Sequence, residues 1–221
     1  AARAEWRQAA DRGRDMRTEW EARFDAYRAA HPQLAAEFER SVIRGDLPED
    51  WDADVPDLSG KDDATRSSSG KVLNALAARI PELIGGSADL GGSNKTDIAE
   101  GGSLLADRPD GRVLHFGIRE HAMGGVMNGM ALHGGVRPFG GTFLIFSDSM
   151  RPAIRLAALM EVPFTFVFTH DSIGIGEDGP THQPIEQLMA LRLIPNLMDL
   201  RPADPEEVAI DCRLAAHRTD G

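Results

Sequence analysis

The stretch THDSIGIGEDGPTHQP, residues 169–184, gathers side chains that could do chemistry. His170 and His182 can bind hydroxyls or phosphate and move protons near neutral pH, and Asp178 can accept a hydrogen bond or ligate a cation. The glycines between them allow the backbone to approach a ligand closely. A nucleotide loop, a metal site and a wall for a polar substrate are the interpretations to weigh.

A dinucleotide site is the weakest of these. Gly174, Gly176 and Gly179 match G-x-G-x-x-G, but Glu177 and Asp178 inside the loop would repel a diphosphate. The residues PTHQP follow the last glycine, where the fingerprint needs the first turn of a helix. We therefore expect the match to be accidental.

A metal site is also disfavoured. His170, Asp178 and His182 supply a set of two histidines and one carboxylate, but their spacing fits no compact zinc motif and no cysteine lies nearby. Polar groups in a loop after a strand more often serve a polar substrate or acid–base chemistry. The sequence therefore predicts a substrate wall, with no metal held by this chain.

Composition narrows the class of protein. The chain of 221 residues is 42% apolar and 27% charged, which suits one large domain or one domain plus an arm. Its 24 basic and 35 acidic residues give a net charge of −11, which disfavours nucleic acid and anionic membranes as partners. Cys212 is the single cysteine, so no internal disulfide is possible, and no apolar run could span a bilayer. We expect a cytoplasmic protein and, because the chain starts without Met and stops at HRTDG, a piece of a longer one.

The chain is expected to divide near residue 60. Residues 1–45 are rich in Ala, Arg, Glu and Asp, and Trp20, Phe24 and Tyr27 recur at helical spacing. This pattern predicts a charged helical arm with one apolar stripe. Residues 46–63 are acidic and contain prolines and a glycine, a composition typical of a linker.

From residue 64 the pattern alternates between helix and strand. Apolar stripes predict helices at 67–80, 119–133, 150–160, 184–193 and 205–217. Ser67 to Ser69 offer caps for the first helix, and Pro152 is tolerable only in a first turn. Apolar runs predict strands at 82–86, 113–117, 136–139, 163–169 and 196–202.

Strands without alternation, separated by helices, indicate a parallel sheet that is covered on both faces. The predicted fold class is therefore α/β: a doubly wound, mostly parallel sheet with helices on both faces, preceded by the helical arm. Ligands of such sheets bind at the carboxyl ends of the strands. The loops after residues 84, 116 and 169 all follow strands, so we expect them to converge at one edge.

Several long motifs, in order, resemble one family. HFGIREHAMGGVMNGMALHGGVRPFGGTFLIF (115–146) and THDSIGIGEDGPTHQPIEQL (169–188) are similar to the central, pyrimidine-binding domain of transketolases. PELIGGSADLGGSN (81–94) resembles the first strand and loop of that domain, and ATRSSSG (64–70) resembles its opening helix. The resemblance implies thiamine diphosphate-dependent transfer of a two-carbon ketol unit from a ketose phosphate to an aldose phosphate, the transketolase reaction (EC 2.2.1.1) of the pentose phosphate pathway and the Calvin cycle.

The resemblance also implies the cofactor residues. Glu120, in GIREH, matches a glutamate that shares a proton with the aminopyrimidine ring, although its spacing alone would indicate only an acid at a helix start. Phe143 and Phe146 match aromatic residues that stack against the ring, and Asp89 matches an acid near the cofactor. Ser149 stands where many relatives carry an aromatic residue, so one wall of that pocket departs from the family pattern.

Substrate residues follow from the same motifs. His170, Asp178 and His182 match residues that contact a sugar phosphate, which favours such substrates over pyruvate. Arg66 and Ser93 match residues that hold the substrate phosphate, and a guanidinium suits bidentate phosphate contact. Without the motifs, Arg66 and Ser93 would be taken as ordinary surface residues.

The implied domains are an arm and linker at 1–60, from a preceding diphosphate-binding domain, and a pyrimidine-binding domain at 61–221, truncated before its last strand. The family's G-D-G motif and downstream Asn, which bind Mg²⁺ or Ca²⁺ and the diphosphate, have no counterpart here. We therefore expect the chain alone to be inactive and the complete protein to be a homodimer. The alternatives left open are dihydroxyacetone synthase, 1-deoxyxylulose-5-phosphate synthase and a non-catalytic transketolase-like module.

Overall fold

The computed structural model describes residues 2–219, which divide between Asp46 and Leu47 into two compact units. The first unit contains two α-helices and a π-helix: α1 (Ala2–Ala30), α2 (Pro32–Phe38) and η1 (Glu39–Arg44). Among the described residues, no helix has the length and apolar character needed to cross a bilayer.

The apolar stripe predicted for the arm is confirmed. The ring of Phe24 stacks on those of Trp20 and Tyr27, with centroid distances of 5.1 and 6.2 Å. Phe24 also contacts Phe38 at 5.5 Å, which joins α1 to α2 within this unit. Because α1 has no buried residue, its stability within this chain rests on such stacks and on exposed ion pairs one helical turn apart.

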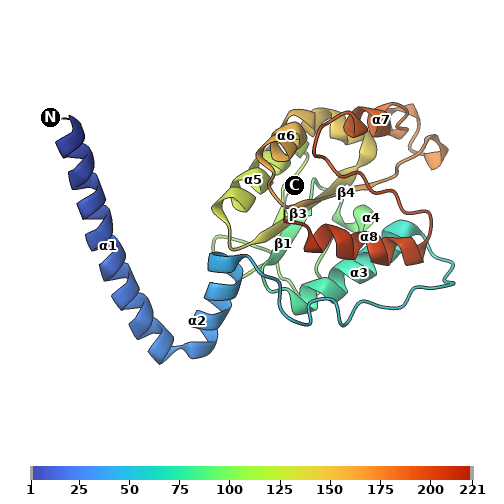
Figure 1. Ribbon diagram of the computed structural model, residues 1–221. Coiled ribbons are helices and arrows are strands. Elements are labelled where there is room, and N and C mark those ends of the chain that lie inside the picture. The colour runs from blue at the N-terminus through green and yellow to red at the C-terminus, as the bar shows by residue number, and fades with distance from the viewer. Residues whose placement is uncertain (1, 220–221) are drawn as a thin grey trace. The chain divides into compact units, whose positions relative to one another are not determined.

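The second unit is a four-stranded parallel sheet with helices on both faces, which confirms the predicted fold class (Figure 1). The strand order is β2-β1-β3-β4. The strands are β1 (Leu83–Ser87), β2 (Val113–His115), β3 (Arg137–Phe143) and β4 (Thr165–Thr169). The α-helices are α3 (Thr65–Arg79), α4 (Gly91–Asn94), α5 (Glu120–His133), α6 (Ser147–Met160), α7 (Gln187–Arg192) and α8 (Pro205–His217). Three short 3-10 helices complete the unit: η2 (Leu144–Phe146), η3 (Ile173–Ile175) and η4 (Pro180–His182).

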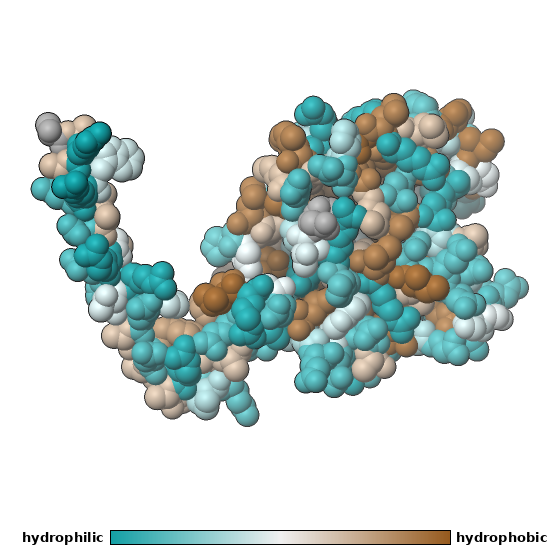
Figure 2. Space-filling view, viewed as in Figure 1, coloured by the Kyte–Doolittle hydropathy of each residue, from teal (hydrophilic) through white to brown (hydrophobic). Residues whose placement is uncertain are grey.

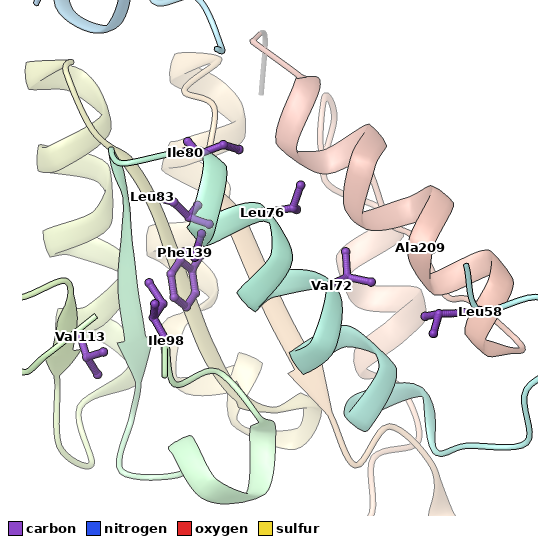
Figure 3. Close-up of a cluster of buried hydrophobic side chains, with 10 residues drawn as sticks. Leu58, Val72, Leu76, Ile80, Leu83, Ile98, Val113, Phe139 and Ala209 are labelled. Atoms are coloured by element: carbon purple, nitrogen blue, oxygen red, sulfur yellow. The ribbon is translucent and has the colours of Figure 1, made fainter. Parts of the chain in front are cut away.

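Each face of the sheet has its own apolar core. Helices α3 and α8 cover one face, where Val72, Leu76 and Ile80 form the apolar stripe of α3 and belong to one buried cluster with Phe139 and Ala209 (Figure 3). Helices α5 and α6 cover the other face through a second cluster, whose buried members are Ala88, Met123, Met127, Leu144, Met150, Ile154, Ala158, Leu191 and Ile194. Both faces are therefore covered over β1 and β3, as their apolar runs require, whereas most residues of β4 are only partly buried.

Glycines in the strands allow this close packing. A Cβ on Gly140 would lie 2.4 Å from the sulfur of Met127, so α5 rests directly on the backbone of β3. A Cβ on Gly85 would lie 2.0 Å from the carbonyl oxygen of Phe139 on the neighbouring strand. These distances are too short for any side chain, so β1 and β3 need glycine at 85–86 and 140–141.

The segment 46–63, which the composition indicated as a linker, belongs to the second unit from Leu47 onward and packs on its core. Leu58 is buried in the core, and Leu47, Trp51 and Val55 pack against it. Arg79 of α3 also donates two hydrogen bonds to the carboxylate of Asp54, at 2.5 and 2.8 Å. Although the segment is rich in acids, an apolar residue recurs every three or four positions from Leu47 to Leu58, and these apolar residues pack on the core.

The strand predicted at 196–202 is wrong. Within the described part of the chain, β4 pairs with β3 alone, and a cleft of about 180 Å³ lies between β4 and the segment that contains Met198 and Leu200. A strand exists only when a neighbour completes its hydrogen-bond ladder. The segment is instead held by ion pairs, with Asp199 bound to Arg192 at 3.1 Å and Arg201 bound to Asp171 at 2.7 Å.

Helix starts also differ from the predictions. The N-cap of α3 is Ala64, which has no capping side chain, while Ser68 is buried inside the helix. Helix α6 begins at Ser147, so Pro152 lies past the first turn and removes one backbone hydrogen bond there. The predicted helix at 184–193 begins only at Gln187.

Helices α5 and α6 expose apolar side chains on their outer sides (Figure 2). Val126 of α5 is 46% exposed, and Leu156 and Leu159 of α6 are 48% and 64% exposed. Apolar residues gathered on two packed helices are typical of a surface that another protein covers.

We expect Leu76→Ala to lower the free energy of unfolding of this chain by about 2–4 kcal/mol, because it leaves a cavity between α3 and the sheet. The exposed Met189→Ala is the control and should change it by less than about 0.5 kcal/mol. Urea unfolding followed by circular dichroism measures both. Equal effects of the two substitutions would contradict the core described here.

Candidate functional site

The carboxyl ends of the parallel strands meet at one edge of the sheet, as predicted. Ser87, at the end of β1, lies in register with Gly141 of β3, and Phe143, at the end of β3, lies in register with Thr169 of β4. The loop before α5 leaves the same edge, because β2 is parallel to β1. Residues far apart in the sequence thereby become neighbours.

A cluster of four rings occupies this edge. The imidazole of His170 stacks on Phe143 with a centroid distance of 3.7 Å. Phe146 lies nearly parallel to Phe143 at 6.1 Å, and His182 packs edge-on against Phe146 at 5.3 Å. The structure therefore brings both predicted phenylalanines together with both predicted histidines.

His170 has a strained backbone, and both nitrogens of its ring lie close to polar groups. Its backbone lies in the left-handed region with φ +53°, which is uncommon for a residue other than glycine. The Thr169 hydroxyl lies 2.9 Å from Nδ1, and Nη1 of Arg66 lies 3.3 Å from Nε2. Burial lowers the pKa of His170, the Arg66 guanidinium and His182 lower it further, and Asp178 and Asp171 oppose them.

Arg66 also forms a hydrogen bond with Ser93. Nη1 of Arg66 donates to the Ser93 carbonyl oxygen at 3.2 Å, so the first turn of α3 is tied to α4. Arg66 remains exposed at this position. The guanidinium therefore faces the edge of the sheet with donors available to an anion.

Glu120 is the first residue of α5 and is only 8% exposed. The Thr142 hydroxyl donates to its Oε1 at 3.5 Å, and Thr142 directly precedes Phe143 in β3. A carboxylate at a helix N-terminus is stabilised by the helix dipole. The combination places a buried acid beside the strand that carries the ring cluster.

The loop 170–184 folds as two single turns, η3 and η4. Gly176 and Gly179 have φ of +81° and +76°, values that favour glycine. The three-residue turn η4 follows Gly179 in place of the long helix that a dinucleotide loop needs, so the nucleotide interpretation finds no support. In the part of the chain that the structure describes, no three His, Cys, Asp or Glu side chains come together as metal ligands.

Asp178, Asp89 and Ser149 lie outside the ring cluster. Asp178 is exposed and acts on His170 through its charge. Asp89 follows β1 with φ +64° and is exposed, and Ser149 is exposed in the first turn of α6. Among the described residues, neither Asp89 nor Ser149 contacts the four rings through a hydrogen bond or ion pair.

Sequence reasoning missed three polar residues beneath the site. Asn94 and Thr142 are fully buried, and Thr169 is 8% exposed. Each lies next to a residue that a motif had singled out: Ser93, Phe143 or His170. That adjacency was the one signal available, since short polar residues at strand ends are common.

A cleft of about 790 Å³ adjoins the site between β4, α3 and α8. Arg66, His170 and Asp178 are among its polar lining residues. Cys212 of α8 also lines the cleft, and burial raises the pKa of that thiol to about 11. The thiol is therefore a poor nucleophile.

Comparison with known proteins gives one consistent result. Residues 61–221 match the family "Transketolase, pyrimidine binding domain". The chain is 56% identical over 209 residues to a transketolase of Geobacillus stearothermophilus, which covers 94% of this chain and 31% of that protein. It thus spans about a third of the length of the curated relatives that it matches.

Solved structures agree. A mutant transketolase of Pichia stipitis in complex with fructose 6-phosphate superposes with a TM-score of 0.93 at 41% identity, covering 98% of this chain and 33% of that one. A transketolase of the same organism in complex with sedoheptulose 7-phosphate gives 0.89 at 42% identity, covering 94% and 32%. The family match and these superpositions identify the fold as that of a pyrimidine-binding domain. The chain belongs to the transketolase pyrimidine-binding domain family.

We expect Arg66→Met to raise the pKa of His170. The substitution removes a nearby cation and a donor to Nε2, both of which favour the neutral imidazole. An NMR titration of the histidine ring protons in this chain measures the shift, and Arg155→Met, on the exposed side of α6, is the control. An unchanged or lower pKa in Arg66→Met would contradict the coupling.

Proposed function

We propose that this chain is the central domain of a transketolase, a transferase that moves a two-carbon ketol unit from a ketose phosphate to an aldose phosphate. The observation that carries the proposal is the ring cluster of Phe143, Phe146, His170 and His182 beside a buried Glu120. Such a site offers an aromatic wall, an acid and phosphate-binding donors at one sheet edge. Glu177 and Asp178 in the loop disfavour a dinucleotide, and the net charge of −11 disfavours a nucleic acid.

The residues present fit the pyrimidine half of thiamine diphosphate. Phe143 and Phe146 supply nearly parallel aromatic faces, and Glu120 supplies a buried carboxyl that can share a proton with a ring nitrogen. Asp89, at the same edge, is the further cofactor residue that the family resemblance implies. When bound, the cofactor supplies a carbon nucleophile that attacks the carbonyl of the ketose.

The substrate side is built around Arg66 and His170. The guanidinium of Arg66 and Ser93 of α4 would hold the phosphate of the substrate. A guanidinium can donate two parallel hydrogen bonds to phosphate oxygens, and Arg66 is already held next to Ser93. His182 would contact sugar hydroxyls and exchange protons with them, His170 would line the substrate site beside Arg66, and Asp178 would accept a hydrogen bond from a hydroxyl. Complexes of related transketolases with fructose 6-phosphate and sedoheptulose 7-phosphate support sugar phosphates as the substrate class.

Catalysis by the complete protein would also need groups outside this chain. Mg²⁺ or Ca²⁺ and the diphosphate would be bound by a separate domain, so this chain alone would be inactive. The exposed apolar side chains of α5 and α6 suit a homodimer interface, and we propose a cytoplasmic homodimer. Dihydroxyacetone synthase is the second candidate, because its sugar substrates would use the same histidines.

We expect Glu120→Gln, in the protein that joins this chain to its diphosphate-binding domain, to reduce ketol transfer about 10²- to 10⁴-fold at saturating cofactor, because the amide cannot exchange the proton. Glu100→Gln, in an exposed loop, is the matched control and should retain full activity. Transfer from a ketose phosphate to an aldose phosphate is measured by product formation. Activity of Glu120→Gln within twofold of the parent would contradict the assigned role.

A further inference from the structure

A continuous line of hydrogen-bonding groups runs beneath the site from Asn94 to Arg66. The Thr169 hydroxyl lies 3.4 Å from Oδ1 of Asn94 and 2.9 Å from Nδ1 of His170. The other ring nitrogen of His170, Nε2, lies 3.3 Å from Nη1 of Arg66. The line thus connects a fully buried amide to an exposed guanidinium.

The chemistry of arginine fixes the direction of every bond in this line. A guanidinium has donors and no acceptor, so Nε2 of His170 must accept with its lone pair. In the neutral imidazole the proton is then on Nδ1, which donates to the Thr169 oxygen. Thr169 accordingly gives its own proton to Oδ1 of Asn94, which is the arrangement that the structure has.

Asn94 forms the buried end of the line. It is 0% exposed and closes α4, and its Nδ2 has no hydrogen-bond partner among the described residues. Turning the amide over would present that donor to Thr169 and send the hydroxyl proton toward Nδ1. Nδ1 would then be the acceptor and Nε2 would carry the proton, in conflict with Arg66.

The histidine ring has little freedom to escape this arrangement. It is stacked on Phe143 at 3.7 Å, and its backbone is held at φ +53°. The charges around it are Arg66, His182, Asp178 and Asp171, and burial together with Arg66 favours the neutral ring. A neutral ring with a defined tautomer is therefore available to orient the guanidinium.

We propose that Asn94 and Thr169 are positioning residues that hold His170 as its Nδ1–H tautomer, so that the Nε2 lone pair orients Arg66 toward the phosphate of the substrate. The phosphate part of this inference rests on the function proposed above. The tautomer part rests on the hydrogen-bond geometry alone. Substrate affinity is thereby linked to two buried residues that do not touch the substrate.

The first test locates the ring proton. The chain is labelled with ¹⁵N in histidine, and the nitrogen shifts of His170 are measured near pH 7.5. We expect Nδ1–H in the parent and in Thr169→Ser, which keeps the hydroxyl. In Thr169→Val, which has the same shape without it, Nδ1–H loses its acceptor, so we expect a shift toward Nε2–H with loss of the Arg66 contact. A parent with Nε2–H, or with both nitrogens protonated, would overturn the proposal whether or not the protein transfers ketol units.

The second test measures kinetics in the protein that contains the cofactor-binding domains. Thr169→Val should raise the KM of a phosphorylated ketose about tenfold with little change in kcat, and Thr169→Ser should restore the parent value. The KM of a ketose without phosphate should not change. Equal effects on both ketoses would overturn the link to phosphate while leaving the ketol transferase assignment intact, and absence of transfer by the parent would instead refute the proposed function.

Discussion

The parallel pairing of β1, β3 and β4 is the constraint on which the rest of the molecule depends. Its register sets Phe143 beside Thr169, and so brings the end of β3 against His170 and the loop that follows. Since successive side chains of a strand point to opposite faces, a slip of one residue would turn Phe143 away from His170 and move Phe139 to the face where α5 packs against Gly140. The glycines of β1 and β3 protect this register, because only they allow backbone and helices to approach so closely.

The site combines rigid support with stored strain. Phe143 is 5% exposed, and Thr142, Thr169 and Asn94 are buried beneath the rings, so the wall of the site is part of the core. His170 lies in a backbone conformation that costs about 1–3 kcal/mol. Ring stacking and hydrogen bonds at both nitrogens offset this cost. A histidine held in this way is oriented before any ligand arrives, which reduces the entropy lost on binding.

Much of this could be predicted from the sequence, because its signals are local. The stripe of Val72, Leu76 and Ile80 has the helical period, and the apolar runs separated by helices indicate a parallel sheet. The convergence of Glu120, Phe143 and His170 then follows from parallel strands ending at one edge.

The predictions that failed depend on pairing between segments far apart in the sequence. Residues 196–202 have the composition of a strand but no adjacent ladder, and the acids of 46–63 hide the buried Leu58. The hydrogen-bond line through Asn94 and Thr169 depends on neighbours that the sequence does not reveal.

The central claim is that the edge of this sheet receives an aminopyrimidine ring between aromatic side chains and the carboxyl of Glu120. A crystal structure of the complete protein with thiamine diphosphate tests it most directly. The account predicts a Glu120 oxygen within about 3 Å of a ring nitrogen, at hydrogen-bond distance, with Phe143 or Phe146 against the ring face. A ring bound elsewhere, with the Glu120 carboxylate still directed only at Thr142, would contradict it.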